Sequence, residues 1–219
     1  MTSKKKNTVS RTKIEQLCRS EADLASHIKK VLSEHKPRSF EFDTKKSVPA
    51  AVLIPIYFKD DQAHLLFTKR TSLVEHHKGQ VSFPGGRKDK EDESLLITAL
   101  RETEEEVGIC RSDIRIAGQT DRFLTNTYFM VTPFAGFFNY PYNFTVSEAE
   151  IERLIEVPLV HLLDDRHFEV KPFKKDGHTW MVHYYRHGTD VIWGVTGFLL
   201  SNFLSIVFGC DRNIFSQFK

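Results

Sequence analysis

The pattern of apolar and polar residues predicts a chain of strands framed by helices. A nearly continuous apolar run over 47–58 predicts a buried strand, and 64–70 predicts a second strand that pairs with it as a hairpin. Apolar residues at helical spacing predict one or two helices over 14–36. Strands with helices before, between and after them predict an α/β fold, an α/β/α sandwich with a mixed β-sheet. The other predicted elements are strands over 114–123 and 128–138, a short helix over 148–154, a hairpin of 168–173 with 179–185, and a last helix over about 195–208.

One predicted helix, over 94–107, carries the strongest chemical pattern. It contains neither glycine nor proline, and its apolar residues recur at a spacing that gives one buried face. Glu102, Glu105 and Glu106 stand at i, i+3 and i+4, so a helix places them on one side. Three carboxylates this close repel one another unless a hard divalent cation lies among them, and Mg²⁺ prefers oxygen ligands. Gly108 is placed to end the helix.

Residues in front of this helix extend the pattern. Gly85 and Gly86 lead into its loop, and a glycine lets backbone approach an ion closely, so the Gly86 carbonyl is a further candidate metal ligand. Glu93 and Arg101 stand eight residues apart, and we expect them to pair and hold the loop against the helix. The alternative is an ordinary solvated helix face, which would leave the glycines, Glu93 and Arg101 unexplained.

The pattern resembles the Nudix box, G-x5-E-x7-R-E-U-x-E-E-x-G-U, in which U is aliphatic. The spacing matches from Glu93 to Ile109, but six residues separate Gly86 from Glu93, and Thr103 replaces an aliphatic residue. The resemblance implies a Nudix-type α/β/α sandwich and a hydrolase that cleaves a nucleoside diphosphate linked to another moiety, using Mg²⁺ or Mn²⁺. The roles that it implies are metal binding by Glu102, Glu106 and Gly86, metal binding or water polarisation by Glu105, and orientation of these groups by Glu93 and Arg101.

Residues upstream of the box resemble a narrower branch, the coenzyme A pyrophosphatases. Leu65–Thr71 and Gly79–Gly86 follow its signature L-L-T-x-T-R/S-S-x3-R-x3-G-x3-F-P-G-G, and Ile192–Gly197 is similar to its terminal I-W-G-x-T. The resemblance covers about 47–208 and implies hydrolysis of coenzyme A or acyl-coenzyme A to 3′,5′-ADP and 4′-phosphopantetheine. The departures are Glu75 in place of the signature arginine, and Phe67, Lys69 and Thr71 at three hydroxyl positions.

Such a substrate needs cations for its phosphates and an apolar path for its pantetheine arm. Glu75 would repel an anionic group, which keeps other substrates open: ADP-ribose, NADH or a capped RNA. A Nudix-fold binding module without turnover is a third interpretation. Glu148 and Glu150 are weaker candidates for a general base. We interpret them first as ordinary solvated acids at the start of a helix. The candidate substrate-binding residues are Arg70, Lys69, Lys78, Phe83, Gly85 and Arg87, and Phe123, Tyr128, Phe129 and Phe134 are candidate walls for the arm.

Charge and composition narrow the class of protein. The net charge is +2, and residues 1–13 carry five basic residues and no acidic one, so the rest of the chain is −3. We therefore expect a basic disordered tail over 1–13 and no nucleic-acid partner. The partner that the resemblance implies is a small-molecule substrate, coenzyme A or a related nucleotide. The three cysteines are far apart, which favours a reducing, cytoplasmic location. Nothing in the sequence fixes an oligomeric state.

One stretch without charge raises the question of a membrane. Residues 191–210 contain no charged side chain and are long enough to cross a bilayer. Ser201, Asn202 and Ser205 give that stretch a polar side, so we expect a helix packed in the core and no membrane partner. The predicted organisation is thus the tail, a helical segment over 14–36 and a catalytic domain over 45–210.

Overall fold

The computed structural model describes residues 9–38, 47–71, 79–175 and 177–212. Its main sheet is built around β1 (Val48–Lys59), which pairs in parallel with β7 (Phe129–Phe137) and antiparallel with β2 (Gln62–Arg70). This confirms the predicted mixed sheet. The other strands of this sheet are β3 (Val81–Ser82), β4 (Gly85–Arg87), β5 (Arg115–Gln119), β6 (Phe123–Leu124) and β8 (Ile151–Pro158).

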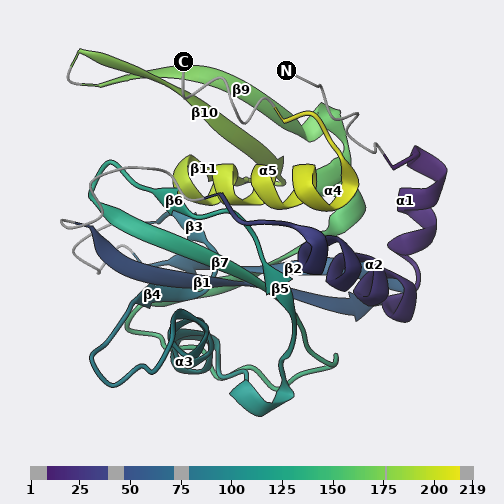
Figure 1. The fold of residues 1–219 in the computed structure, drawn as a ribbon, viewed down its shortest axis with the longest axis horizontal. Coiled ribbons are helices and arrows are strands. Elements are labelled where there is room, and N and C mark those ends of the chain that lie inside the picture. The colour runs from purple at the N-terminus through teal and green to yellow at the C-terminus, as the bar shows by residue number, and fades with distance from the viewer. Residues whose placement is uncertain (1–8, 39–46, 72–78, 176, 213–219) are drawn as a thin grey trace.

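Helices cover both faces of the main sheet, as predicted. In Figure 1, α3 (Leu95–Val107) lies on one face, and α2 (Glu21–Glu34) and α5 (Gly194–Phe208) lie on the other. Two buried apolar clusters separate the three layers, one on each face of β1. The shorter helices are α1 (Arg11–Leu17) and α4 (Leu159–Leu163), and 3₁₀ turns cover Arg111–Asp113 and Asp165–His167.

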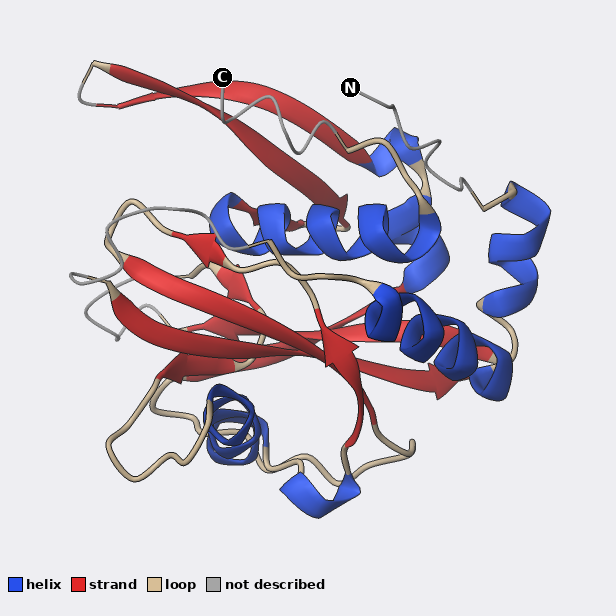
Figure 2. Ribbon diagram, viewed as in Figure 1, coloured by secondary structure: helices blue, strands red, loops and turns tan. Residues whose placement is uncertain are grey.

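A second sheet explains why the last helix is buried and carries no charged residue. The strands β9 (Phe168–Lys175), β10 (His178–His187) and β11 (Asp190–Trp193) form a three-stranded antiparallel sheet beyond α5, as Figure 2 shows. The helix α5 therefore lies between two sheets, and a helix with no solvated face is apolar all round. In the part of the chain that the structure describes, no helix is long and apolar enough to cross a membrane.

The hairpin of β1 and β2 follows the sequence closely. Its turn residues Asp60 and Asp61 both have positive φ (51° and 55°), which is the geometry of the tight hairpin turn that matches strand twist. Aspartate tolerates this conformation better than most residues. The predicted hairpin of 168–173 with 179–185 is also present, as β9 and β10.

The predicted helix over 148–154 is wrong. Residues 151–158 form β8, which pairs antiparallel with β2 along its whole length. Ile151, Leu154 and Ile155 stand at helical spacing, which misled the prediction, whereas the free edge of β2 determines the structure. Strand formation depends on such pairing more than on local preference. A bulge in this ladder lies opposite Lys69 and Arg70.

The N-terminal helix begins earlier than predicted. Ser10 caps α1 by accepting a hydrogen bond from the Lys13 amide (3.3 Å), and the Val9 amide donates to the Phe208 carbonyl (3.1 Å). The residues of the predicted tail from Val9 onward are therefore part of the fold. Residues 1–8 lie outside the described residues.

A buried histidine joins α5 to the second sheet. His183 on β10 has no solvent exposure, and its Nδ1 lies 2.6 Å from the Ser201 Oγ of α5. The Tyr185 hydroxyl lies 2.7 Å from the same oxygen. Burial, and secondarily the charge of Arg212, lowers the pKa of His183 to about 4. The imidazole is thus neutral in the folded protein near neutral pH.

We expect this histidine to weaken the fold in mild acid. Unfolded histidine has a pKa of about 6.5, so between that pH and 4 the unfolded chain binds a proton that the folded chain does not. The free energy of unfolding should fall by about 2 kcal/mol from pH 7 to pH 5 on this account. His183→Gln, which cannot titrate, should lose that part of the pH dependence in urea unfolding at the two pH values. An equal fall in the variant would contradict the assignment.

Candidate active site

The helix α3 has the boundaries that its sequence predicts. The Ser94 Oγ accepts a hydrogen bond from the Ile97 amide (3.2 Å) and caps the N-terminus. Gly108 follows the last turn in the left-handed conformation (φ 76°), and its amide donates to the Glu104 carbonyl. The buried side of the helix packs on β1, which fixes the acidic side against β4.

The glycine pair lets β4 lie directly against this helix. A Cβ on Gly85, whose φ is 151°, would come within 2.3 Å of the Ala51 carbonyl oxygen. A Cβ on Gly86 would come within 2.6 Å of the Glu102 carboxylate. Any larger residue would push the strand away, so both positions need glycine for close approach.

Glu106 is the buried acid of the site. Its side chain is 5% exposed and accepts hydrogen bonds from the Gly85 amide (3.3 Å) and the Arg70 guanidinium (3.3 Å). Burial raises the pKa of Glu106 to about 8, although Arg70 and the Gly85 amide act in the opposite direction. Burial likewise raises the pKa of Glu102, against the nearby charge of Arg101. For both carboxylates the effect of burial on the pKa is therefore larger than the opposing effect of the nearby arginine.

Arg101 holds the loop to the helix, but its partner is Asp92 and the predicted pair with Glu93 is wrong. Its Nε and Nη2 each donate to one oxygen of Asp92, both at 3.0 Å. This paired geometry holds the pKa of Asp92 well below its usual range. Glu93 is exposed. Five residues separate Gly86 from Asp92, so the box keeps its first spacing and the extra residue lies between the acid and Arg101.

The same guanidinium also contacts two of the predicted metal-binding acids. Arg101 Nη2 lies 2.9 Å from Glu102, and Nη1 lies 2.8 Å from Glu105. Glu105 has a side chain 59% exposed, so it faces solvent at the rim while Glu106 lies inside. Arg101 thus orients the acidic side of α3 from its loop end.

The bulged strand β8 brings one more acid to the site. Arg70 bridges Glu106 and Glu150, with 3.4 Å between its Nη2 and the Glu150 Oε2. Glu150 is a weak candidate in the sequence, because the sequence predicts a helix over 148–154. The pairing of β8 with β2 brings this acid beside Arg70. A candidate base therefore lies at the open side of the site.

The other predicted substrate-binding residues do not all lie beside Glu106. Lys69 points to the opposite face of β2 from Arg70, and lies 3.4 Å from Glu152 and 3.9 Å from Asp190. Phe83 is buried and stacks on Phe67 with ring centroids 4.7 Å apart, which is a core role. Arg87 is exposed at the end of β4. Lys78 lies outside the described residues, with Glu75, His76 and His77.

Similar proteins identify the family to which this chain belongs. The NUDIX domain family matches residues 47–152. An uncharacterized Nudix hydrolase NudL of Yersinia enterocolitica is 36% identical over 169 residues, which cover 77% of this chain and 85% of that protein. This chain belongs to the Nudix hydrolase family. The NudL of Photorhabdus laumondii is 34% identical over 151 residues, covering 69% of this chain and 80% of that protein.

Family membership makes the chain a pyrophosphatase that acts on a nucleoside diphosphate derivative. Among solved structures, a C. elegans Ap4A hydrolase binary complex has a TM-score of 0.44 and 19% identity, and the match covers 52% of this chain and 81% of that one.

The residues present fit the divalent cation that Nudix hydrolases use. The candidate ligands offer only oxygen, and the close approach of Gly86 to the Glu102 carboxylate forms a cradle that a Cβ would fill. Within the described ranges no three acidic, histidine or cysteine side chains converge ready to hold an ion. Arg70 contacts Glu106 and Arg101 contacts Glu102 in this arrangement. A cation that binds here would compete with those two guanidinium groups.

We expect Asp92, and not Glu93, to matter for the stability of the site. Asp92→Asn should lower the free energy of unfolding by roughly 1.5–3 kcal/mol, the usual worth of hydrogen bonds to a charged group. Glu93→Gln is the matched control on the adjacent residue and should change stability by less than about 0.5 kcal/mol, as surface substitutions do. Urea unfolding of both variants measures this. Equal losses would show that Arg101 does not depend on Asp92.

Proposed function

We propose that this Nudix hydrolase cleaves the pyrophosphate bond of coenzyme A or acyl-coenzyme A, with Mg²⁺ or Mn²⁺, to 3′,5′-ADP and the corresponding 4′-phosphopantetheine. The observation that carries the proposal is the course of the signature stretch in space. It runs along β2 to Arg70 and returns through β3 to the glycine pair, and both ends meet Glu106. Substrate-branch residues and box residues therefore belong to one site.

The side chains divide the work by position. Glu102, Glu106 and the Gly86 carbonyl would hold the cation, which would supply positive charge against the diphosphate and make water more acidic. Arg70 lies between Glu106 and Glu150, where it can transfer its contact from a carboxylate to a phosphate oxygen. Arg101 orients Glu102 and Glu105 through its own pair with Asp92.

Two groups are placed to accept the proton of the attacking water. Glu105 is at the solvent-exposed rim of the acidic side, and Glu150 faces the same site from the start of β8. A base must reach the water that it deprotonates, and both carboxylates lie on the open side of the buried Glu106. The oxygen of that water forms a bond to one phosphorus of the diphosphate while the bond from this phosphorus to the bridging oxygen breaks, so each product leaves with one of the two phosphates.

Glu75 favours a second group of substrates as the alternative to coenzyme A. It stands where the coenzyme A signature has arginine, and its carboxylate would oppose an additional phosphate. ADP-ribose, NADH and a capped RNA carry a diphosphate without the 3′-phosphate of coenzyme A. A binding module without turnover is disfavoured because the box retains all three of its helix acids.

A substrate panel tests the proposal directly. The purified protein with Mg²⁺ or Mn²⁺ should release 3′,5′-ADP from coenzyme A faster than it cleaves ADP-ribose, NADH or capped RNA, as measured by chromatography of the products. Faster cleavage of any of the others would replace coenzyme A by that substrate. No turnover of any of them would favour the binding module.

We expect Glu106→Gln to separate catalysis from folding. The rate should fall by more than about 100-fold, since loss of even an outer-shell partner of a metal costs 10–100-fold. The fold should persist because the amide keeps the shape of the buried acid, which circular dichroism and the melting temperature check. Binding of Mn²⁺, followed by electron paramagnetic resonance, should weaken in parallel.

The control is Glu104→Gln on the same helix. Glu104 pairs with Arg111 at 2.8 Å, away from the glycine pair, so its loss should leave the rate and Mn²⁺ binding near wild type. Near-normal turnover in Glu106→Gln, or an equal loss in both variants, would disprove the site assignment.

A further inference from the structure

Tyr128 has a backbone conformation that a tyrosine side chain does not favour. Among the described residues, only Asp60, Asp61 and Tyr128 have positive φ without being glycine, and Tyr128 has φ 63°. The two aspartates form a tight turn, where such residues are tolerated. A bulky side chain in the left-handed region is a strained outlier.

Hydrogen bonds fix the loop that holds this residue. The Tyr128 amide donates to the Thr125 carbonyl (3.0 Å), and the Thr125 amide donates to the Phe129 carbonyl (2.8 Å). The Thr125 hydroxyl accepts from the Phe129 amide (3.0 Å), and the Tyr128 carbonyl accepts from the Val48 amide (2.8 Å). A turn followed by a left-handed residue is a common hairpin connection, in which glycine usually occupies the last position.

The ring of Tyr128 gains nothing from the core. It is 63% exposed, and the only other exposed large apolar side chain in the described residues is Phe173 at 39%. Glycine at position 128 would remove both the strain and the exposed apolar surface. The tyrosine therefore serves something outside the fold, because strain persists where it has a function.

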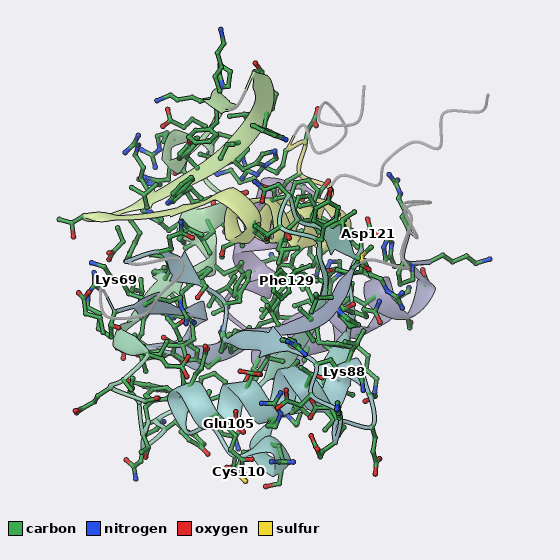
Figure 3. All side chains as sticks on the ribbon, turned by 90° about the vertical axis from the view of Figure 1, so that its left-hand side faces the viewer. Lys69, Lys88, Glu105, Cys110, Asp121 and Phe129 are labelled. Carbon is green, nitrogen blue, oxygen red and sulfur yellow. The ribbon has the colours of Figure 1, made fainter. Side chains whose placement is uncertain are left out.

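The sheet places this ring at the end of the molecule that carries the glycine pair. Ala50 of β1 pairs with Val131 of β7 on one side and with Arg87 of β4 on the other. Two strand spacings separate β4 from β7, about 10 Å. Tyr128 lies just before β7 at this end of β1. Figure 3 looks onto this end, with Phe129 near the centre, Lys69 to its left, and Lys88 and Glu105 below it.

We propose that Tyr128 is the platform on which the base of the nucleotide substrate stacks. Aromatic side chains bind bases through the ring face, which every base shares. The diphosphate at Glu102 and Glu106 would extend past the exposed Arg87 towards Tyr128, and the base would cover the ring. The inference rests on the proposed function only in that the substrate contains a nucleoside diphosphate.

Tyr128→Gly tests this assignment with two independent measurements. The melting temperature should rise, because strain is removed, and affinity for ADP in the presence of Mg²⁺, measured by calorimetry, should fall roughly 5-fold or more. With coenzyme A as substrate, the KM should rise by a similar factor while kcat is kept. Tyr128→Phe keeps the ring and should bind ADP as wild type does. Phe173→Ala, a control at an exposed aromatic of the second sheet, should leave ADP affinity unchanged.

The outcomes separate this inference from the proposed function. Weaker ADP binding in Tyr128→Gly supports the platform even when the wild-type protein does not cleave coenzyme A, and only the coenzyme A proposal then fails. Equal ADP affinity in Tyr128→Gly and wild type overturns the platform, as does a wild-type protein that does not bind ADP. A lower melting temperature in Tyr128→Gly also overturns it, because the ring would then be structural.

Discussion

The site depends on one close approach, that of the β4 backbone to the acidic side of α3. Two glycines permit it, and a Cβ on either would collide with a carbonyl or a carboxylate. The approach buries Glu106 and lets the Gly85 amide donate to it. A carboxylate buried in this way needs positive charge, which Arg70 supplies in part and a divalent cation would complete. The burial and charge of the helix acids therefore depend on the two glycines of the loop.

The local part of this arrangement was predictable and the long-range part was not. The helix α3, its cap at Ser94 and its end at Gly108 follow from residues within one turn of each other. The contact of Arg70 with Glu106 joins residues 36 apart, and that with Glu150 joins residues 80 apart. No periodicity in the chain encodes these distances, since the first arises from the packing of α3 on the sheet and the second from the pairing of β2 with β8. The misassigned helix over 148–154 hid Glu150 for the same reason.

The partner of Arg101 shows a subtler limit. The box spacing predicts Glu93, because seven residues separate it from Arg101 as in the family pattern. The loop instead keeps its length from Gly86 to Asp92 and adds a residue just before the helix. An acid in such a loop is identified by where the chain turns, and Asp92 is held there by its bonds to the Asp89 amide and the Thr98 hydroxyl. Counting along a sequence does not distinguish the two possibilities.

The position of α5 between two sheets has a consequence for synthesis of the chain. The apolar face formed by β1, β2 and β7 is completed by side chains of α5 such as Phe203 and Phe208, which the ribosome adds only after every strand of the main sheet has been made. The candidate catalytic residues all precede α5 by more than 40 residues, with Glu150 the last of them. A nascent chain therefore carries its candidate active site while one face of the sheet still lacks its cover. During that interval this exposed apolar face is the part of the chain that most needs chaperones to prevent aggregation.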